Sequence, residues 1–249
     1  MKITFLGTGT STGVPTIGCA CAVCRSNDPR NKRRRASIYV QAAGQHIIID
    51  TPPDFRDQVL TFGVCRVDAV LITHAHADHC GASAALRERL GVEVALSRQE
   101  AEFLEQGDEV AISLDRARAE GIYPADYRLT PCTVDRRLSH GDEVRCGHLA
   151  VRAIEVGGHS PGSICYFLSG GQRPCLFSGD TVFPFGTISL LNCEGSSLAG
   201  YRRDIGRLAN LGVEALLPGH GGFCLGGGQH HIDQTIDALK SIWPPKNYL

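Results

Sequence analysis

The chain has 249 residues, of which 43% are hydrophobic and 20% charged, with a formal net charge of -1 and a pI near 6.8. A chain of this length can bury a large core, and its balanced charge argues against a general nucleic-acid binder. No apolar run approaches the roughly 18 residues needed to cross a bilayer, and no export signal precedes the first strand. We therefore expect one domain over residues 1–249, a cytoplasmic location and no contact with membranes.

The first elements are expected to be a strand over residues 2–6 and a glycine-rich turn over residues 7–15. The turn lacks the lysine of a phosphate-binding loop and no clear helix follows, so a tight backbone turn is the default interpretation. Three thiols then follow within six residues, at Cys19, Cys21 and Cys24. Such dense thiols converge readily on one zinc ion with a fourth ligand from elsewhere, and free or redox-active thiols are the alternative. Without an export signal, thiols and metal ligands account for the eleven cysteines better than disulfides do.

A basic run over residues 30–35 leads into polar-apolar alternation over residues 37–40. The run either guides an anionic substrate or is a solvent-exposed segment at the start of a strand. The next apolar strand, over residues 46–49, ends at Asp50. A carboxylate in that position can orient a metal-binding loop or accept a proton from a ligand imidazole.

The densest motif in the chain follows a short apolar, β-branched run over residues 68–72 and precedes a helix start near residue 81. His74, His76, Asp78 and His79 lie on this strand-to-helix loop, a place from which several side chains can point at one spot. Imidazole and carboxylate are first-choice ligands for zinc and similar divalent ions. The motif therefore predicts a metal site.

Helical stretches over residues 97–104 and 113–118 carry no ligand cluster, and we expect this region to cover the site and influence substrate choice. His140 and His148 lie in turn-rich segments and are expected at the surface. Three later strands each end at one potential ligand beside glycine, which lets the backbone approach closely. These strands span residues 149–156, 175–178 and 213–217, and they lead to His159, Asp180 and His220.

The pattern His74-x-His76-x-Asp78-His79 resembles the signature of the metallo-β-lactamase superfamily, and the chain is identified as a member. This resemblance implies an α/β fold, a four-layer αββα sandwich with its metal site at one edge. It also implies two divalent ions, zinc first and manganese or iron as alternatives. The implied ligands are His74, His76 and His159 for one ion and Asp78, His79 and His220 for the other, with Asp180 bridging and Asp50 supporting the ligands from behind.

The amino-terminal third resembles phosphoribosyl cyclic phosphodiesterases of phosphonate breakdown and, more distantly, ribonuclease Z. The cysteine cluster and the segments at residues 28–31 and 50–56 carry this resemblance. It implies a structural zinc on Cys19, Cys21 and Cys24, with the last ligand near the carboxyl end. Cys224 is the preferred fourth ligand because four thiolates form a common closed site, and His230 and His231 remain open.

The segments at residues 179–183 and 218–221 instead resemble hydroxyacylglutathione hydrolases. The cyclic phosphodiesterases use a further histidine between the bridging aspartate and the last ligand, and this chain has none between Asp180 and His220. We expect a metal-dependent hydrolase that attacks with a hydroxide held by two ions and oriented by Asp78. A small, cyclic phosphodiester is the favoured anionic substrate, and thioester or lactone hydrolysis is the alternative. A metal-dependent redox protein and a non-catalytic binding module are weaker hypotheses, and a homodimer is left open.

Overall fold

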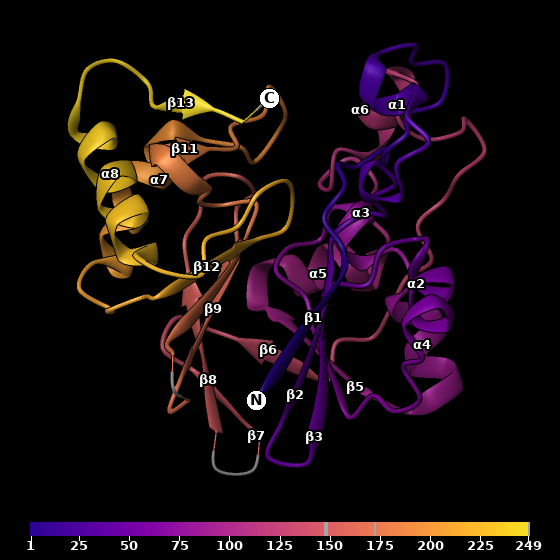
Figure 1. Ribbon diagram of the computed structural model, residues 1–249, viewed down its shortest axis with the longest axis horizontal. Helices are drawn as coiled ribbons and strands as arrows, with labels where there is room; N and C mark the ends of the chain where they lie inside the picture. The colour runs from indigo at the N-terminus through magenta and orange to yellow at the C-terminus, as the bar shows by residue number, and fades with distance from the viewer. Residues whose placement is uncertain (147–148, 172, 249) are drawn as a thin grey trace.

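The computed structural model describes residues 1–146, 149–171 and 173–248 and contains two main β-sheets (Figure 1). The six-stranded sheet has the order β1-β2-β3-β4-β5-β6, and the five-stranded sheet has the order β12-β10-β9-β8-β7. A small parallel ladder joins β11 to β13. The strands of the first sheet are β1 (Lys2–Gly7), β2 (Ser37–Ala42), β3 (Gln45–Ile49), β4 (Ala69–Leu71), β5 (Glu93–Ser97) and β6 (Arg136–Leu138). The remaining strands are β7 (Glu143–Cys146), β8 (Leu149–Glu155), β9 (Ile164–Ser169), β10 (Cys175–Gly179), β11 (Thr187–Ile188), β12 (Ala215–Pro218) and β13 (Lys246–Asn247).

Strand β3 shows why its residues form a central strand with both faces covered. Successive side chains of a strand point to opposite faces, so Ile47 and Ile49 pack between the two sheets while Ile48 packs beneath the helices. The layer between the sheets also holds Tyr166 and Phe177 from the second sheet, both at most 1% exposed. Burying large apolar side chains on both faces accounts for the near-continuous hydrophobic runs of these strands.

Helices cover the outer face of each sheet (Figure 1). On the first sheet, Phe55 and Leu104 pack against strand residues such as Val70. On the second sheet, Tyr201 and Ile232 pack against strand residues such as Ile154. The helices of the first half are α1 (Ala22–Arg25), α2 (Phe55–Phe62), α3 (Ala77–Cys80), α4 (Ser83–Leu90), α5 (Arg98–Gln106) and α6 (Leu114–Ala119), with the short 3₁₀ segment η1 (Pro29–Asn31). Those of the second half are α7 (Leu198–Asp204) and α8 (Gly228–Lys240), with the 3₁₀ segments η2 (Pro184–Gly186) and η3 (Ile205–Leu208).

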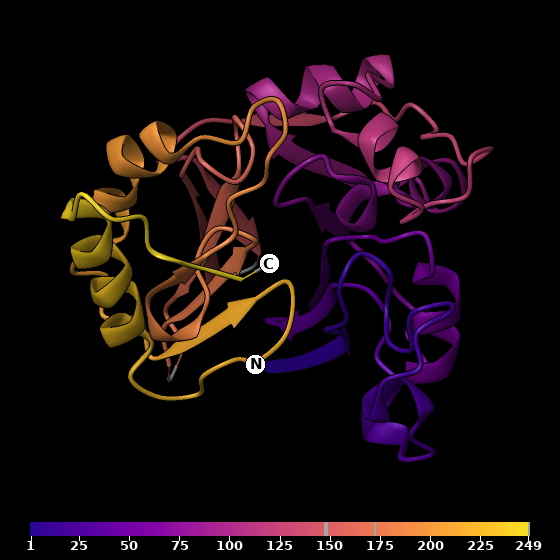
Figure 2. The ribbon, with the colours of Figure 1, turned by 90° about the horizontal axis from the view of Figure 1, so that it is seen from above.

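The layer order is therefore helices, sheet, sheet, helices, which confirms the α/β sandwich expected from the sequence. Figure 2 shows the two halves side by side from above. Strands β4, β8, β10 and β12 lead directly into the loops that carry the predicted ligands. Within the part of the chain that the structure describes, no helix is long and apolar enough to cross a membrane.

Candidate metal centre

Four loops, one from the first sheet and three from the second, bring the predicted ligands into one cluster. The loop after β4 runs into α3 and carries His74, His76, Asp78 and His79, and the loops after β8, β10 and β12 supply the other three. All seven side chains are buried except His76, which is partly exposed. The loop residues Ile72 and Thr73 are tied to both sheets, because Ile72 donates to the Ala95 carbonyl and the Thr73 carbonyl accepts from Ile164.

The first group consists of His74, His76 and His159. Nε2 of His159 lies 3.2 Å from Nε2 of His74 and 3.1 Å from Nδ1 of His76. Nε2 of His74 lies 3.1 Å from Nδ1 of His76. Three imidazole nitrogens thus surround one point, as the ligands of a single ion do.

The second group consists of Asp78, His79 and His220. Nε2 of His220 lies 3.3 Å from Nε2 of His79 and 3.3 Å from Oδ2 of Asp78. Asp180 lies between the two groups, with its oxygens 3.5 Å from Nε2 of His79, 3.1 Å from Nε2 of His220 and 3.6 Å from Nε2 of His159. A carboxylate in this position can bridge two ions.

The outer nitrogens of three histidines have fixed partners. Nδ1 of His79 lies 2.8 Å from Oδ2 of Asp50, and Nδ1 of His159 and of His220 donate to the carbonyls of Ser189 and Gly9 at 2.9 and 2.6 Å. Because these partners only accept, each Nδ1 carries a proton, and each Nε2 faces into the cluster, where it offers a lone pair to an ion once any second ring proton has left.

Lone pairs 3.2–3.3 Å apart repel each other unless a proton or a cation lies between them. Oδ1 of Asp180 is also buried without a hydrogen-bond partner among the described residues. Buried polar atoms are normally paired, so this oxygen and the converging nitrogens fit divalent ions well.

The pKa values of the cluster differ between its two sides. Burial lowers the pKa of His159 to about 4 and holds the pKa of His74 well below its usual range. Burial also opposes charge on His220, but the carboxylates of Asp180 and Asp78 outweigh it and raise the pKa of His220 to about 10. In the metal-free protein the first group is therefore neutral at pH 7, whereas His79 and His220 of the second group are protonated beside ionised carboxylates. Ions at the second group must displace those protons.

Asp50 supports the cluster from behind. It is 3% exposed and adopts a left-handed backbone conformation with φ 64°, which a short polar side chain tolerates better than most. Besides His79, its carboxylate accepts from the backbone N–H of Thr73 at 2.8 Å and from the Thr73 hydroxyl at 2.9 Å. Asp50 thus holds both the ligand ring and the start of the ligand loop.

The cysteine cluster forms a separate group at the start of α1. The sulfurs of Cys19, Cys21 and Cys24 lie within 4.8 Å of one another, and no fourth ligand atom joins them among the described residues. A hydrogen bond from the backbone N–H of Cys24, followed by contacts with the other two thiols, lowers the pKa of Cys21 to about 7. A substantial fraction of Cys21 is therefore thiolate at neutral pH, the form that binds metal.

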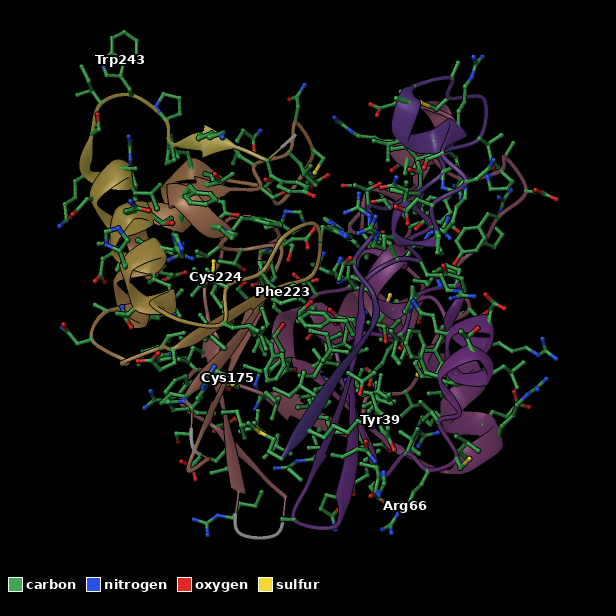
Figure 3. The ribbon with its side chains drawn as sticks, in the orientation of Figure 1. Tyr39, Arg66, Cys175, Phe223, Cys224 and Trp243 are labelled. Atoms are coloured by element: carbon green, nitrogen blue, oxygen red, sulfur yellow. The ribbon has the colours of Figure 1, made fainter. Side chains whose placement is uncertain are left out.

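Cys224 does not lie with these three cysteines, so its sequence-based preference as the fourth ligand is wrong. Its backbone pairs with Leu216, and its side chain packs against the core beneath α7 and α8. Figure 3 shows Cys224 in the α8 half, whereas Figure 1 shows α1 in the opposite half. His230 and His231 lie on α8, so they are not brought to the cluster either. The spacing of the cysteines in the sequence could not reveal that Cys224 lies in the half of the molecule that contains α8, away from α1.

A pocket of about 510 Å³ opens beside His76 and Asp78. Its apolar wall contains residues from α6, from the segments on either side of it and from the loop after β11: Ile112, Leu114, Ile122, Leu190 and Leu191. Arg116 spans it by donating to the Asn192 carbonyl at 2.7 Å. A larger hollow of about 720 Å³ is lined by Phe5 and Phe223 among others, but by none of the metal-ligand candidates.

Tyr123 and Arg35 add polar groups at this pocket. Tyr123 lines it, and its hydroxyl is buried without a hydrogen-bond partner among the residues described. The Arg35 guanidinium lies 5.6 Å from the Tyr123 ring centroid and donates from Nε to the carbonyl of Ser11, another pocket residue, at 2.6 Å. Of the basic run, Arg35 is thus the member placed beside the pocket.

Sequence reasoning missed several supporting groups. The carbonyls of Ser189 and Gly9 belong to the backbone and leave no side-chain signal, and nothing in the helical pattern marked Tyr123 as lining the pocket. Thr73 could have been found, because it stands directly before the first ligand and can bond locally. His140 is exposed as expected, and His148 lies outside the described residues.

A family model described as the metallo-beta-lactamase superfamily matches residues 31–220. The chain belongs to the metallo-beta-lactamase superfamily. Members of this superfamily are metal-dependent hydrolases, and the two His/Asp groups form this chain's candidate dinuclear site. The identity of the ions does not follow from this match.

Three curated relatives differ in the reactions their names describe. The chain is 42% identical over 137 residues to an octanoyltransferase of Porphyromonas gingivalis, covering 54% of this chain and 27% of that protein. It is 33% identical over 125 residues to a hydroxyacylglutathione hydrolase of Chelativorans, covering 50% and 38%. It is 30% identical over 212 residues to the acyl-coenzyme A thioesterase MBLAC2 of Bos taurus, covering 75% and 73%. The chain thus spans well under half the length of the first two.

Solved structures agree on the fold. A diphosphatase of the PhnP family superposes with a TM-score of 0.55 at 24% identity, covering 88% of this chain and 85% of that one. A subclass B3 metallo-beta-lactamase of Bradyrhizobium japonicum superposes with a TM-score of 0.62 at 20% identity, covering 82% and 84%. These similarities establish the shared sandwich and leave the reaction open.

Proposed function

We propose that this chain hydrolyses a small anionic phosphodiester, with two divalent ions held by the His/Asp cluster. The observation that carries the proposal is the convergence of seven ligand side chains on two groups that share Asp180, beside an accessible pocket. When bound, such ions supply Lewis acidity, lowering the pKa of water and neutralising charge on the attacked centre.

The chain's own residues orient the reactants. Asp78 lies at the junction of the second group and the pocket, so its carboxylate can accept a hydrogen bond from the attacking water. Burial works against charge on Asp78, but His79 and His220 outweigh it and hold its pKa below the usual range. Asp78 therefore stays ionised and orients the nucleophile.

The leaving alkoxide needs a donor, and the expected extra histidine is absent between Asp180 and His220. The hydroxyl of Tyr123 in the pocket wall, which has no hydrogen-bond partner among the described residues, can take that role. Burial, followed by the nearby Asp78 charge, raises the pKa of Tyr123, so the hydroxyl keeps its proton at neutral pH.

Charge and motif support the phosphodiester assignment. Arg35 places a positive charge beside the pocket, which favours an anionic substrate. The cysteine cluster and the segment at residues 50–56 match the cyclic phosphodiesterase pattern more specifically than the later motifs match thioesterases. As part of the same proposal, Cys19, Cys21 and Cys24 hold a structural zinc whose fourth ligand is not Cys224.

Thioester hydrolysis is the second candidate. Two curated relatives carry the names of thioester-cleaving enzymes, and the pocket wall of Ile112, Leu114 and Leu190 can hold an acyl chain. A thiolate also leaves with less need of a proton donor, which suits a site without the extra histidine.

The experiment compares the zinc-loaded protein on four probes. These are bis-p-nitrophenyl phosphate, a 2′,3′-cyclic nucleotide, an S-acyl glutathione and a lactone, each with the Asp180→Ala variant as control. Turnover of a phosphodiester that Asp180→Ala abolishes supports the proposal. Faster turnover of the thioester or lactone transfers the assignment to that class, and equal activity in Asp180→Ala refutes the use of the cluster.

A further inference from the structure

A buried carboxylate outside the ligand set connects the loops of the first ligand group. Glu100 lies in the first turn of α5 and is 1% exposed. Its Oε2 accepts from the backbone N–H of Ala75 at 3.0 Å. Its Oε1 accepts from the Ser160 hydroxyl at 2.5 Å and from the backbone N–H of Gly162 at 2.9 Å.

These three bonds join both halves of the sandwich at the first group. Ala75 stands between the ligands His74 and His76 on the loop after β4 of the first sheet. Ser160 follows the ligand His159 on the loop after β8 of the second sheet. Glu100 therefore contacts both loops that must meet if these three imidazoles are to surround one ion.

The packing around Glu100 leaves little freedom for another arrangement. A Cβ on Gly162 would lie 2.6 Å from the Ser97 hydroxyl and 3.0 Å from Cγ of Glu100, so only glycine allows this close approach. The Ser97 hydroxyl also accepts from the backbone N–H of Glu100 at 3.2 Å. In a capping box, a glutamate at this position turns back to the Ser97 backbone, whereas here its carboxylate binds the two ligand loops.

We propose that Glu100 is a positioning residue that sets the affinity of the first metal site, formed by His74, His76 and His159. Residues that hold metal ligands in position without binding the metal themselves typically contribute 10- to 100-fold to metal affinity, which is lost when they are mutated. The second site depends on Asp50 instead, because Asp50 contacts His79. This inference rests on the cluster being the metal site of the proposed function, and it is independent of the ester that is cleaved.

The test substitutes Glu100→Gln, which keeps the shape but replaces one accepting oxygen with an NH₂ group facing N–H and O–H donors. Glu105→Gln is the matched control, since Glu105 lies on the same helix and accepts from the backbone N–H of Val134 at 3.0 Å but is not bonded to a ligand loop. Each change is made in His220→Ala, which isolates the first site, and in His159→Ala, which isolates the second. Zinc affinity is measured by competition with a chromophoric chelator.

We expect Glu100→Gln to weaken zinc binding at the isolated first site about 10- to 100-fold and to change the second site less than about twofold, while Glu105→Gln changes neither. Equal weakening of both sites, accompanied by a matching drop in the melting temperature of the metal-free protein, would show a merely structural role and overturn the inference. Unchanged affinity at the first site would also overturn it. Failure of the proposed function is distinguishable, because the parent variants themselves would then bind no zinc beyond the ion assigned to the cysteine cluster.

Discussion

Replacing Asp50 tests how far the metal centre is organised before any ion binds. Asp50→Ala removes the acceptor for the Thr73 backbone N–H, the Thr73 hydroxyl and Nδ1 of His79, all within 2.9 Å of its carboxylate. It also leaves alanine in a left-handed conformation at φ 64°. Asp50→Asn keeps one accepting oxygen and tolerates that backbone conformation.

The magnitude follows from counting donors left without an acceptor. The Thr73 hydroxyl can rotate to another partner, which leaves the backbone N–H and the imidazole, each worth about 1–3 kcal/mol when buried and unpaired. The left-handed conformation adds about 1 kcal/mol for alanine. We therefore expect Asp50→Ala to lower the free energy of unfolding by about 3–7 kcal/mol and Asp50→Asn by about 1–2 kcal/mol.

Urea unfolding of the metal-free proteins in a chelator measures these changes, because any bound ion would add its own stabilisation. Asp57→Ala is the control, since Asp57 is largely exposed and its carboxylate pairs with Arg34 on the surface. Its loss should cost less than about 1 kcal/mol. An Asp50→Ala protein within 1 kcal/mol of wild type would refute the view that Asp50 holds the ligand loop in place without metal.

Three further predictions concern other parts of the molecule. Hydrogen bonds from Arg87 lower the pKa of Asp135, so their stabilisation is present above the unfolded value of 3.8 and lost as pH falls through the lower folded value. Asp135→Asn should therefore reduce the free energy of unfolding by about 0.5–1 kcal/mol at pH 7, and equal differences at pH 7 and pH 2 in denaturant titrations would contradict this. Cys21→Ser should lower the zinc content by one ion per chain and lower the melting temperature. An unchanged zinc content and melting temperature would refute the structural zinc site. Tyr123→Phe should lower kcat on a phosphodiester about 10- to 1,000-fold with a smaller effect on a p-nitrophenyl ester, whose leaving group needs no proton, whereas Tyr127→Phe should leave both rates unchanged.

Much of the fold and of the ligand cluster could be predicted from the sequence because both leave local signals. The apolar run of β3 predicts a buried strand, and the His74–His79 spacing places four ligand side chains on one short loop. The strand ends before His159, Asp180 and His220 repeat the same local pattern. These ligands come together because the strands that precede them belong to sheets packed face to face.

The remaining parts of the site depend on contacts between distant segments. The position of Cys224 depends on where the chain turns after β12, and the local spacing does not encode that path. Glu100 lies in a polar helical stretch that resembles a solvated surface, and only the approach of the Gly162 loop shows that it is buried. The Ser189 and Gly9 carbonyls orient His159 and His220 through the backbone, which any residue type can supply.

The measurement that tests the dinuclear site most directly is the zinc content per chain of the wild type, Asp180→Ala and Cys21→Ser, by elemental mass spectrometry after reconstitution with excess zinc and desalting. About three ions in the wild type, a loss of one or two in Asp180→Ala and a loss of one in Cys21→Ser are predicted. Phosphodiester turnover should disappear in Asp180→Ala and persist in Cys21→Ser. Asp180→Ala with the zinc content and the activity of wild type would contradict a site in which this carboxylate joins two ions.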